Sequence, residues 1–189
     1  TEQIEGIAHK LALEFYPTGD PAVQDAHSHL HLFKQGRHRT MKNLICGRND
    51  DVTLAIFGYR YITGSGKNQR THSQTVFSFQ SAKLSLPEFE IRPEHIFHKI
   101  GQAFGYKDID FSSHPEFSKR YVLRGGDDSA VHSCFTPERL SFFETQEGIN
   151  VEASEDRLIY YKASKRIKPE ALSEFMEEGS RLYALFKEP

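Results

Sequence analysis

The chain has 189 residues, of which 38% are hydrophobic and 26% are charged, and its formal net charge is −2. The length fits one globular domain, and the composition excludes a disordered chain, a collagen-like repeat and a disulfide-stabilised miniprotein. The near-neutral charge also excludes a uniformly basic nucleic-acid binder.

Residues 1–33 are predicted to be helical. Apolar residues recur there at the spacing of one buried helix face: Ile4, Ile7, Ala8, Leu11 and Phe15. The Asp20-Pro21 pair offers an N-cap followed by proline at the first helical position. A second short helix is therefore expected to run to about Phe33.

Residues 34–92 change to a hydrophobic period of two, which predicts strands at 39–48, 52–62, 71–80 and 86–92. The Asn49–Asp51 segment has the composition of a hairpin turn between the first two strands. In the second strand, Leu54 and Ile56 alternate with Tyr59 and Tyr61 on the opposite side. A strand that is apolar on both sides is expected to be covered on both faces of its sheet.

Residues 93–189 mix both structures. We predict a short helix after Pro93, an ordered connection over 105–119, a strand at 120–124 and helices capped by Asp127 or Asp128 and by Thr136. A late hairpin follows at 149–154 and 158–162, in which Glu152 alternates with apolar neighbours. The last helix starts at Pro169 and is long and amphipathic.

The order of these elements predicts an α+β fold for a single domain over residues 1–189. Its strands come in hairpins, and no strand–helix–strand series indicates a parallel sheet. We expect a mainly antiparallel sheet on which N-terminal helices, short central helices and the long C-terminal helix pack. The order of the strands is not readable from the sequence.

The chain carries two distant cysteines, Cys46 and Cys134. We expect two reduced, buried thiols, with a single disulfide as the alternative. No segment approaches the length of about 20 apolar residues that a membrane-spanning helix needs. No cofactor is expected.

Positive charge is concentrated between Lys34 and His72, where eight Lys and Arg face two Asp, for a net charge of +6. The rest of the chain has sixteen basic and twenty-four acidic residues, for a net charge of −8. A hairpin surface of this charge suits anionic lipid headgroups or a nucleic-acid backbone, and a merely solvated strand face is the commoner explanation. The candidate binding residues are Arg37, Arg39, Lys42, Arg60, Lys67 and Arg70.

His27, His29 and His31 are the candidate metal ligands. On a helix, His27 and His31 would share a face, as zinc-binding pairs four residues apart do, while His29 would point away. In a strand all three would share a face. Asp25 is the only local carboxylate, so a hydrated surface helix is the main alternative to a metal site.

Two further segments invite a functional interpretation. Gly64-Ser-Gly-Lys67 resembles part of a phosphate-binding loop, but Arg60 and Asn68 replace residues that the motif requires, so we interpret it as a hairpin loop. The segment from Asp108 to Glu116 has the acidic and histidine residues of an acid–base group, and turn and cap composition explains it equally well.

Four segments resemble an uncharacterised family of bacterial proteins: Phe57–Val76, Leu86–Glu94, Asp108–Gly125 and Phe135–Glu138. The similarity extends from about Arg39 to Phe186. Members of this family often carry hydrophobic segments before this domain, and the chain begins at Thr1. The resemblance implies a membrane-tethered domain and brings no activity, cofactor or catalytic residue.

Our leading functional prediction is a non-enzymatic domain that is tethered beside a bacterial membrane, with the cytoplasmic side favoured. Its basic hairpin surface would bind lipid headgroups or a protein partner. One alternative is a metal-dependent or acid–base enzyme that uses the histidine cluster. Another is single-stranded nucleic-acid binding through Arg and Tyr, which the overall charge disfavours. The oligomeric state is left open.

Overall fold

A computed structural model describes residues 1–49, 51–95 and 108–187. Its centre is an eight-stranded antiparallel sheet in the order β1-β2-β3-β4-β8-β7-β5-β6. The strands are β1 (Glu14–Tyr16), β2 (Arg37–Arg48), β3 (Thr53–Thr63), β4 (Arg70–Gln80), β5 (Leu86–Pro93), β6 (Tyr121–Gly125), β7 (Asn150–Glu155) and β8 (Arg157–Tyr161). The α+β class predicted from the sequence is confirmed.

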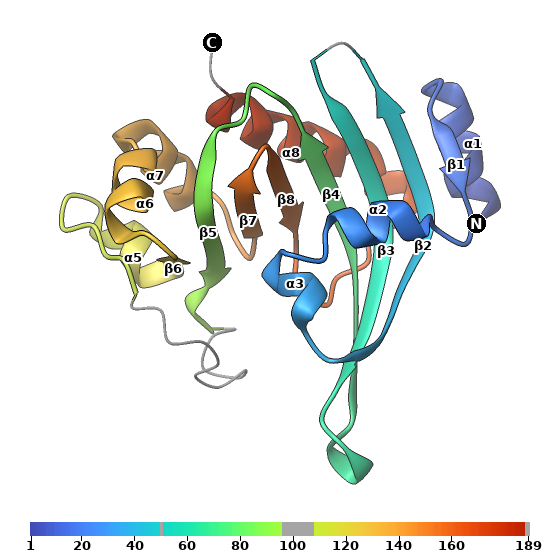
Figure 1. The fold of residues 1–189 in the computed structure, drawn as a ribbon, viewed down its shortest axis with the longest axis horizontal. Coiled ribbons are helices and arrows are strands. Elements are labelled where there is room, and N and C mark those ends of the chain that lie inside the picture. The colour runs from blue at the N-terminus through green and yellow to red at the C-terminus, as the bar shows by residue number, and fades with distance from the viewer. Residues whose placement is uncertain (50, 96–107, 188–189) are drawn as a thin grey trace.

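Helices cover the two faces of the sheet unequally (Figure 1). One face, which we call the α8 face, packs against α1 (Glu2–Lys10), α5 (Pro115–Arg120), α6 (Asp128–Cys134), α7 (Pro137–Glu144) and α8 (Leu172–Phe186). The other, the α3 face, is covered over β2, β3, β4 and β8 by α2 (Pro21–Ala26) and α3 (His31–Lys34). Two short 3₁₀ turns, η1 (Gly66–Asn68) and η2 (Pro169–Ala171), complete the described elements.

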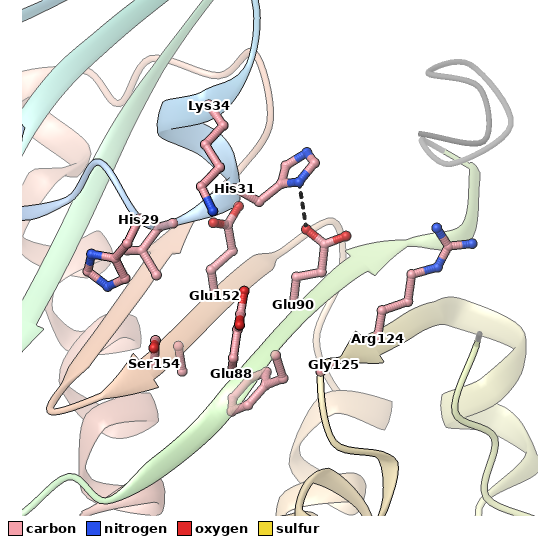
Figure 2. A pocket seen from close by; sticks show the side chains of 13 residues that line it. His29, His31, Lys34, Glu88, Glu90, Arg124, Gly125, Glu152 and Ser154 are labelled. Carbon is pink, nitrogen blue, oxygen red and sulfur yellow. Dashed lines mark ion pairs between the residues drawn. The ribbon is translucent and has the colours of Figure 1, made fainter. Parts of the chain in front are cut away.

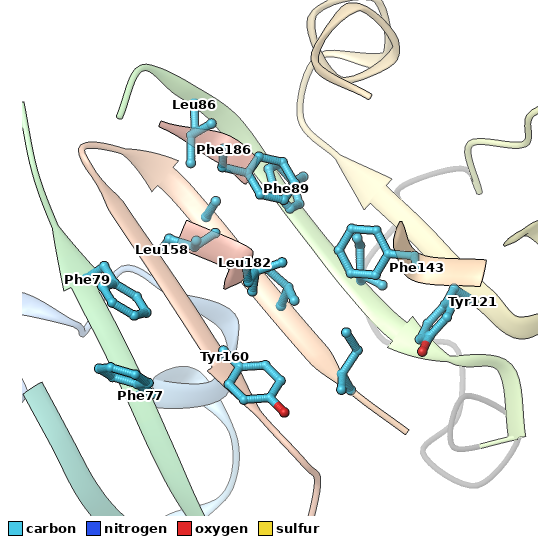
Figure 3. Close-up of a cluster of buried hydrophobic side chains, with 14 of the residues drawn as sticks. Phe77, Phe79, Leu86, Phe89, Tyr121, Phe143, Leu158, Tyr160, Leu182 and Phe186 are labelled. Atoms are coloured by element: carbon cyan, nitrogen blue, oxygen red, sulfur yellow. The ribbon is translucent and has the colours of Figure 1, made fainter. Parts of the chain in front are cut away.

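The α8 face carries the larger core, which is rich in aromatic rings (Figure 3). Phe77 and Phe79 from β4 meet Phe175 and Tyr183 of α8, with ring centroids 6.1 and 5.0 Å apart for the Phe77–Phe175 and Phe79–Tyr183 pairs. Gly179 of α8 lies directly over Phe77. The absence of a side chain at this position lets the helix approach the sheet closely.

The predicted hairpins are present, and β3 is covered on both faces around Ile56 and Phe57, as expected, whereas Arg60 further along the strand is exposed. Ile56 belongs to the core of the α8 face, whereas Phe57, Tyr59 and Tyr61 belong to the core of the α3 face. The late β7–β8 hairpin inserts between β4 and β5, so strands that are far apart in the sequence become neighbours.

The N-terminal segment is not wholly helical, which corrects the prediction for residues 1–33. Helix α1 ends at Lys10, because Ala12 takes a left-handed conformation with φ of 54°. Phe15 does not continue the helix; it lies in β1 and pairs with Ile45 of β2. The second predicted helix is two short helices, α2 and α3, joined by the segment that carries His27 and His29.

The predicted caps are correct. Asp20 accepts a hydrogen bond from the Ala22 amide at 2.8 Å, Asp127 one from the Ala130 amide at 3.0 Å, and Thr136 one from the Arg139 amide at 3.4 Å. Pro93 is the last residue of β5, and the short helix predicted after it lies, beyond residue 95, outside the described residues. The predicted connection after it contains α5 in its described part.

Cys46 and Cys134 are both free thiols, as expected, but they are half-buried and not fully buried as predicted. Burial is the largest cause that raises the pKa of each thiol. Among the described helices, none has the length and apolar character needed to cross a bilayer.

Candidate functional site

The β3–β4 hairpin projects beyond the neighbouring strands and ends at η1 (Figure 1). We call residues 34–48 and 58–75, which include all of β2 and the outer part of this hairpin, the basic arm. The basic arm contains eight Lys and Arg and no Asp or Glu. The positive charge predicted within residues 34–72 therefore lies in the basic arm, and the two Asp of that window lie outside the arm.

A second basic segment joins the arm from a distant part of the sequence. Residues 162–168, which we call the basic loop, follow β8 and lie against β4. The Thr75 amide donates to the Lys165 carbonyl at 3.1 Å, and the Ile167 amide donates to Thr75 Oγ1 at 2.9 Å. The basic loop adds Lys162, Lys165, Arg166 and Lys168, again without an acidic residue. The arm and the loop thus hold twelve of the chain's 24 Lys and Arg.

Three of these cations have structural partners. The Arg39 guanidinium donates to the carbonyls of Lys34 at 2.8 Å, Gln35 at 3.0 Å and Gly36 at 2.9 Å, where α3 leads into β2. Arg37 donates to the Gly64 carbonyl at 2.6 Å and so ties β2 to the tip of the hairpin. Lys162 pairs with Glu178 of α8 at 3.1 Å. Arg37 and Arg39 therefore shape the arm, although both remain exposed.

The other four candidate binding residues are exposed and available. Lys42 and Arg60 lie on the α8 face of the arm, beside a hollow that Arg166 also lines. Lys67 lies in η1, and Arg70 begins β4 next to it. Within the described part of the chain, none of these four side chains makes a hydrogen bond or ion pair. Three of the six candidates thus lie in the β3–β4 hairpin and the other three in the neighbouring strand β2.

The tyrosines that could have stacked on nucleic-acid bases are buried in this arrangement. Tyr59 and Tyr61 lie on the α3 face, where they are 1% and 5% exposed. Tyr59 packs against Phe33 of α3, with ring centroids 4.5 Å apart. Neither ring is available to stack on a base, so the arm offers charge without the aromatic platform that single-strand binders use.

The histidine cluster divides into three different environments. His27 is 1% exposed and packs between Phe33 and Phe57. Its Nδ1 donates to the Val23 carbonyl at 2.5 Å, so Nε2 must accept the hydroxyl of Ser78 at 2.7 Å. His29 is exposed in the connection between α2 and α3, and His31 begins α3.

The three histidines do not form a metal site within the described ranges. No group of three His, Cys, Asp or Glu side chains in residues 1–49, 51–95 and 108–187 is placed to hold a metal ion. Burial lowers the pKa of His27 to about 4 and is also the largest cause that lowers the pKa of His31 to about 4. Both imidazoles are therefore neutral at physiological pH, and His27 holds α2 against β4.

A pocket of 120 Å³ beside α3 contains the most unusual carboxylate of the protein (Figure 2). Glu88 and Glu90 of β5 and Glu152 of β7 stand beneath His31 and Lys34 of α3. Glu152 is 2% exposed, although its alternation with apolar neighbours is typical of a solvent-facing position. The sequence could not show that α3 covers this part of the strand.

Glu90 and Glu152 of this pocket are engaged by the protein itself, whereas Glu88 is exposed. Both oxygens of Glu152 accept the Leu32 amide at 3.0 and 3.1 Å, and Oε1 also accepts the Tyr161 hydroxyl at 2.9 Å. Glu90 pairs with Arg92 at 2.8 Å and lies 3.6 Å from His31 Nδ1. We interpret this cluster as the polar anchor of α3.

The Asp108–Glu116 segment does not assemble as an acid–base group in its described residues. Asp108 pairs with Arg124 at 2.6 Å, whereas Glu116 pairs with Lys119 at 2.8 Å. Gly64–Lys67 forms the turn between two paired strands, as expected for a hairpin loop.

Sequence reasoning missed the contribution of the basic loop. Lys162-Ala-Ser-Lys-Arg-Ile-Lys168 is itself a visible run of positive charge. Its placement beside the arm depends on the pairing of β8 with β4, which joins Val76 to Tyr161. That pairing is a long-range contact without a local signal.

Comparisons with known proteins establish the fold alone. No protein-family model and no curated protein matches the chain. The chain is similar in structure to the mycobacterial trehalose monomycolate transport factor A, TtfA, with a TM-score of 0.69 over 100% of this chain and 97% of that one. The two sequences are 8% identical. The resemblance to an uncharacterised bacterial family remains a prediction.

Proposed function

We propose that this protein is a non-catalytic domain that docks on an anionic membrane surface through the basic arm and the basic loop. The observation that carries this proposal is the joining of segments 34–48, 58–75 and 162–168, which contain no Asp or Glu, into one basic surface. Each Lys or Arg held near an anionic bilayer contributes about 1 kcal/mol to binding. Several unpaired cations on one element are therefore enough for reversible attachment.

The distribution of charge over the molecule favours one orientation. At the other end of the sheet, residues 108–147 contain eight Asp and Glu against four Lys and Arg. An anionic surface attracts the arm and repels this end, so the docked domain would present the arm to the headgroups. The protein named as similar in fold is a trehalose monomycolate transport factor, and a role beside a membrane is compatible with that name.

Vesicle co-sedimentation tests the proposal with a charge-matched pair of variants. One variant carries Arg60→Gln, Lys67→Gln and Arg70→Gln in the arm. The control removes three exposed cations elsewhere, by Lys10→Gln, Arg120→Gln and Lys187→Gln. Vesicles of phosphatidylcholine alone are compared with vesicles that also contain phosphatidylglycerol, at low ionic strength.

We expect the wild type to bind the anionic vesicles and not the neutral ones. The arm variant should bind roughly 100-fold more weakly, because it loses three surface cations, and the control should bind far better than the arm variant. Salt should weaken binding, since charges are screened beyond about 10 Å at 0.1 M. Equal losses in both variants, or no binding by the wild type, would show the proposal to be wrong.

A further inference from the structure

We propose that the hollow on the α8 face of the basic arm is a specific site for a phosphate group. It is lined by the cations Lys42, Arg60 and Arg166 and by the hydroxyl-bearing residues Thr40 and Ser73. This inference rests on the proposed function, because the hollow lies within the same basic surface. It adds a defined ligand chemistry to an otherwise general attraction between charges.

The register of three strands explains why these side chains meet. Thr40 of β2, Arg60 of β3 and Ser73 of β4 are successive cross-strand partners and therefore lie in one row on one face. The next row toward the core consists of Lys42, Gly58 and Thr75. Arg60 and Lys42 thus rise from adjacent rows.

Gly58 forms the floor of the hollow, because it is the one position of the second row that has no side chain. Its backbone is ordinary strand, without a positive φ, so glycine is not required there for conformation. A Cβ at this position would meet only the Lys42 carbonyl oxygen, at 3.4 Å. The volume of 240 Å³ exceeds by far the roughly 10–15 Å³ that a water molecule requires.

The third cation is brought in by the basic loop. Thr75 holds this loop at two points, through its amide to the Lys165 carbonyl at 3.1 Å and through its hydroxyl, which accepts the Ile167 amide at 2.9 Å. Arg166 lies between these two bonds, so its backbone is fixed at the edge of the hollow. In the described residues, Lys42, Arg60 and Arg166 make no ion pair, and no carboxylate lines the hollow.

This donor set fits a phosphomonoester better than a carboxylate. Three cations from three chain segments, with two hydroxyl donors, match a tetrahedral dianion with several acceptor oxygens. Such a group is found on a phosphatidate headgroup and on small soluble phosphate esters. The two sources share the recognition chemistry and differ only in what carries the phosphate.

Gly58→Val tests the site without changing any charge. Valine suits a strand and would fill the floor of the hollow, whereas the attraction of the whole arm for anionic vesicles would remain. Arg60→Gln and Arg166→Gln serve as second and third variants if Gly58→Val folds poorly, and Arg48→Gln is the matched control on the same arm. The soluble probe is glycerol 3-phosphate, followed by amide chemical shifts, and the membrane probe is vesicles of phosphatidate against phosphatidylglycerol at equal charge.

With glycerol 3-phosphate, we expect saturable chemical-shift changes of the amides at 40, 58 and 73 in the wild type. The affinity for this probe should fall at least tenfold in Gly58→Val, Arg60→Gln and Arg166→Gln, but not in Arg48→Gln. A preference for phosphatidate that Gly58→Val abolishes identifies the headgroup as the source. Loss of glycerol 3-phosphate binding alone identifies a soluble ester. Wild-type behaviour of Gly58→Val, Arg60→Gln and Arg166→Gln with both probes would overturn the phosphate site, even where anionic vesicles still bind. Phosphate binding without any vesicle binding would instead overturn the proposed membrane function and leave the site standing.

Discussion

Glu152 is a carboxylate enclosed between α3 and the sheet. Burial, followed by the neighbouring Glu90 carboxylate, raises its pKa from 4.5 to about 7, against the opposing effects of Arg92, the Leu32 amide and the Tyr161 hydroxyl. The folded protein therefore holds this proton more tightly than the unfolded chain does. Its contribution to stability is fully present below the unfolded pKa and is lost as pH rises through about 7.

We predict that Glu152→Gln removes a contribution to the free energy of unfolding that declines as the pH rises from 5 to 8. The wild type should lose up to about 3 kcal/mol more than the variant over this range, because a shift of one pKa unit corresponds to 1.36 kcal/mol. Urea denaturation at several pH values measures both proteins. His27 and His31 act in the opposite direction, since their contributions are lost as pH falls from 6.5 toward 4, and they are present in both proteins.

Glu155→Gln is the control for this experiment, because Glu155 lies on the same strand and is exposed. It should follow the wild type at each pH. Parallel curves for the wild type and Glu152→Gln would mean that the buried carboxylate is not the titrating group.

The sequence pattern correctly predicted which residues of a strand share a face, but it did not predict whether the polar side chains on that face are buried. Alternation placed Glu152 opposite Val151 and Ala153, which is correct. Whether the opposite face is covered depends on where α3 packs, and a short helix from residues 31–34 has little local signal. His27 illustrates the same point, since its partner Ser78 is 51 positions away.

At the scale of elements, the contact of α8 with β4 depends on a glycine. A Cβ at Gly179 would approach Phe77 Cε1 to 2.9 Å and Cδ1 more closely still, which is tighter than carbon atoms tolerate. Phe77 is 1% exposed and is itself packed against Phe79 and Phe175. Neither the ring nor the helix has space to move without disturbing this core.

Gly179→Ala should therefore destabilise the protein, although alanine is favoured over glycine in a helix by about 1 kcal/mol. We expect overpacking to cost about 1–3 kcal/mol and to outweigh the gain in helix propensity. Ser180→Ala, at the exposed neighbouring position, should be neutral or slightly stabilising. Chemical denaturation of the two variants measures the difference, and equal stabilisation by both would refute this account of the contact.

Local signals were sufficient for most elements and insufficient for their arrangement. Caps and alternation located the hairpins and the last helix within a few residues. The end of α1 at Lys10 depends on the left-handed conformation of Ala12 and on the pairing of Phe15 with Ile45, neither of which the helical periodicity reveals. The insertion of the β7–β8 hairpin between β4 and β5 likewise depends on long-range packing.

At the scale of the whole molecule, a net charge of −2 is the balance of two opposed ends. The segments of the basic arm and the basic loop contain no Asp or Glu, and the region of α5, α6 and α7 is predominantly acidic. The sequence alone located the arm within residues 34–72. The fold adds the basic loop, assigns structural roles to Arg37 and Arg39, and leaves Lys42, Arg60, Lys67 and Arg70 exposed.

The most direct test of the central claim is hydrogen–deuterium exchange of the protein with and without anionic vesicles at low salt. We predict that exchange slows at the arm tip, residues 62–71, and at the basic loop, residues 162–168, whereas residues 108–147 are unchanged. Neutral vesicles should have no effect at either place. Slower exchange over residues 108–147 with an unchanged arm and loop would contradict the claim that the basic surface is the docking surface.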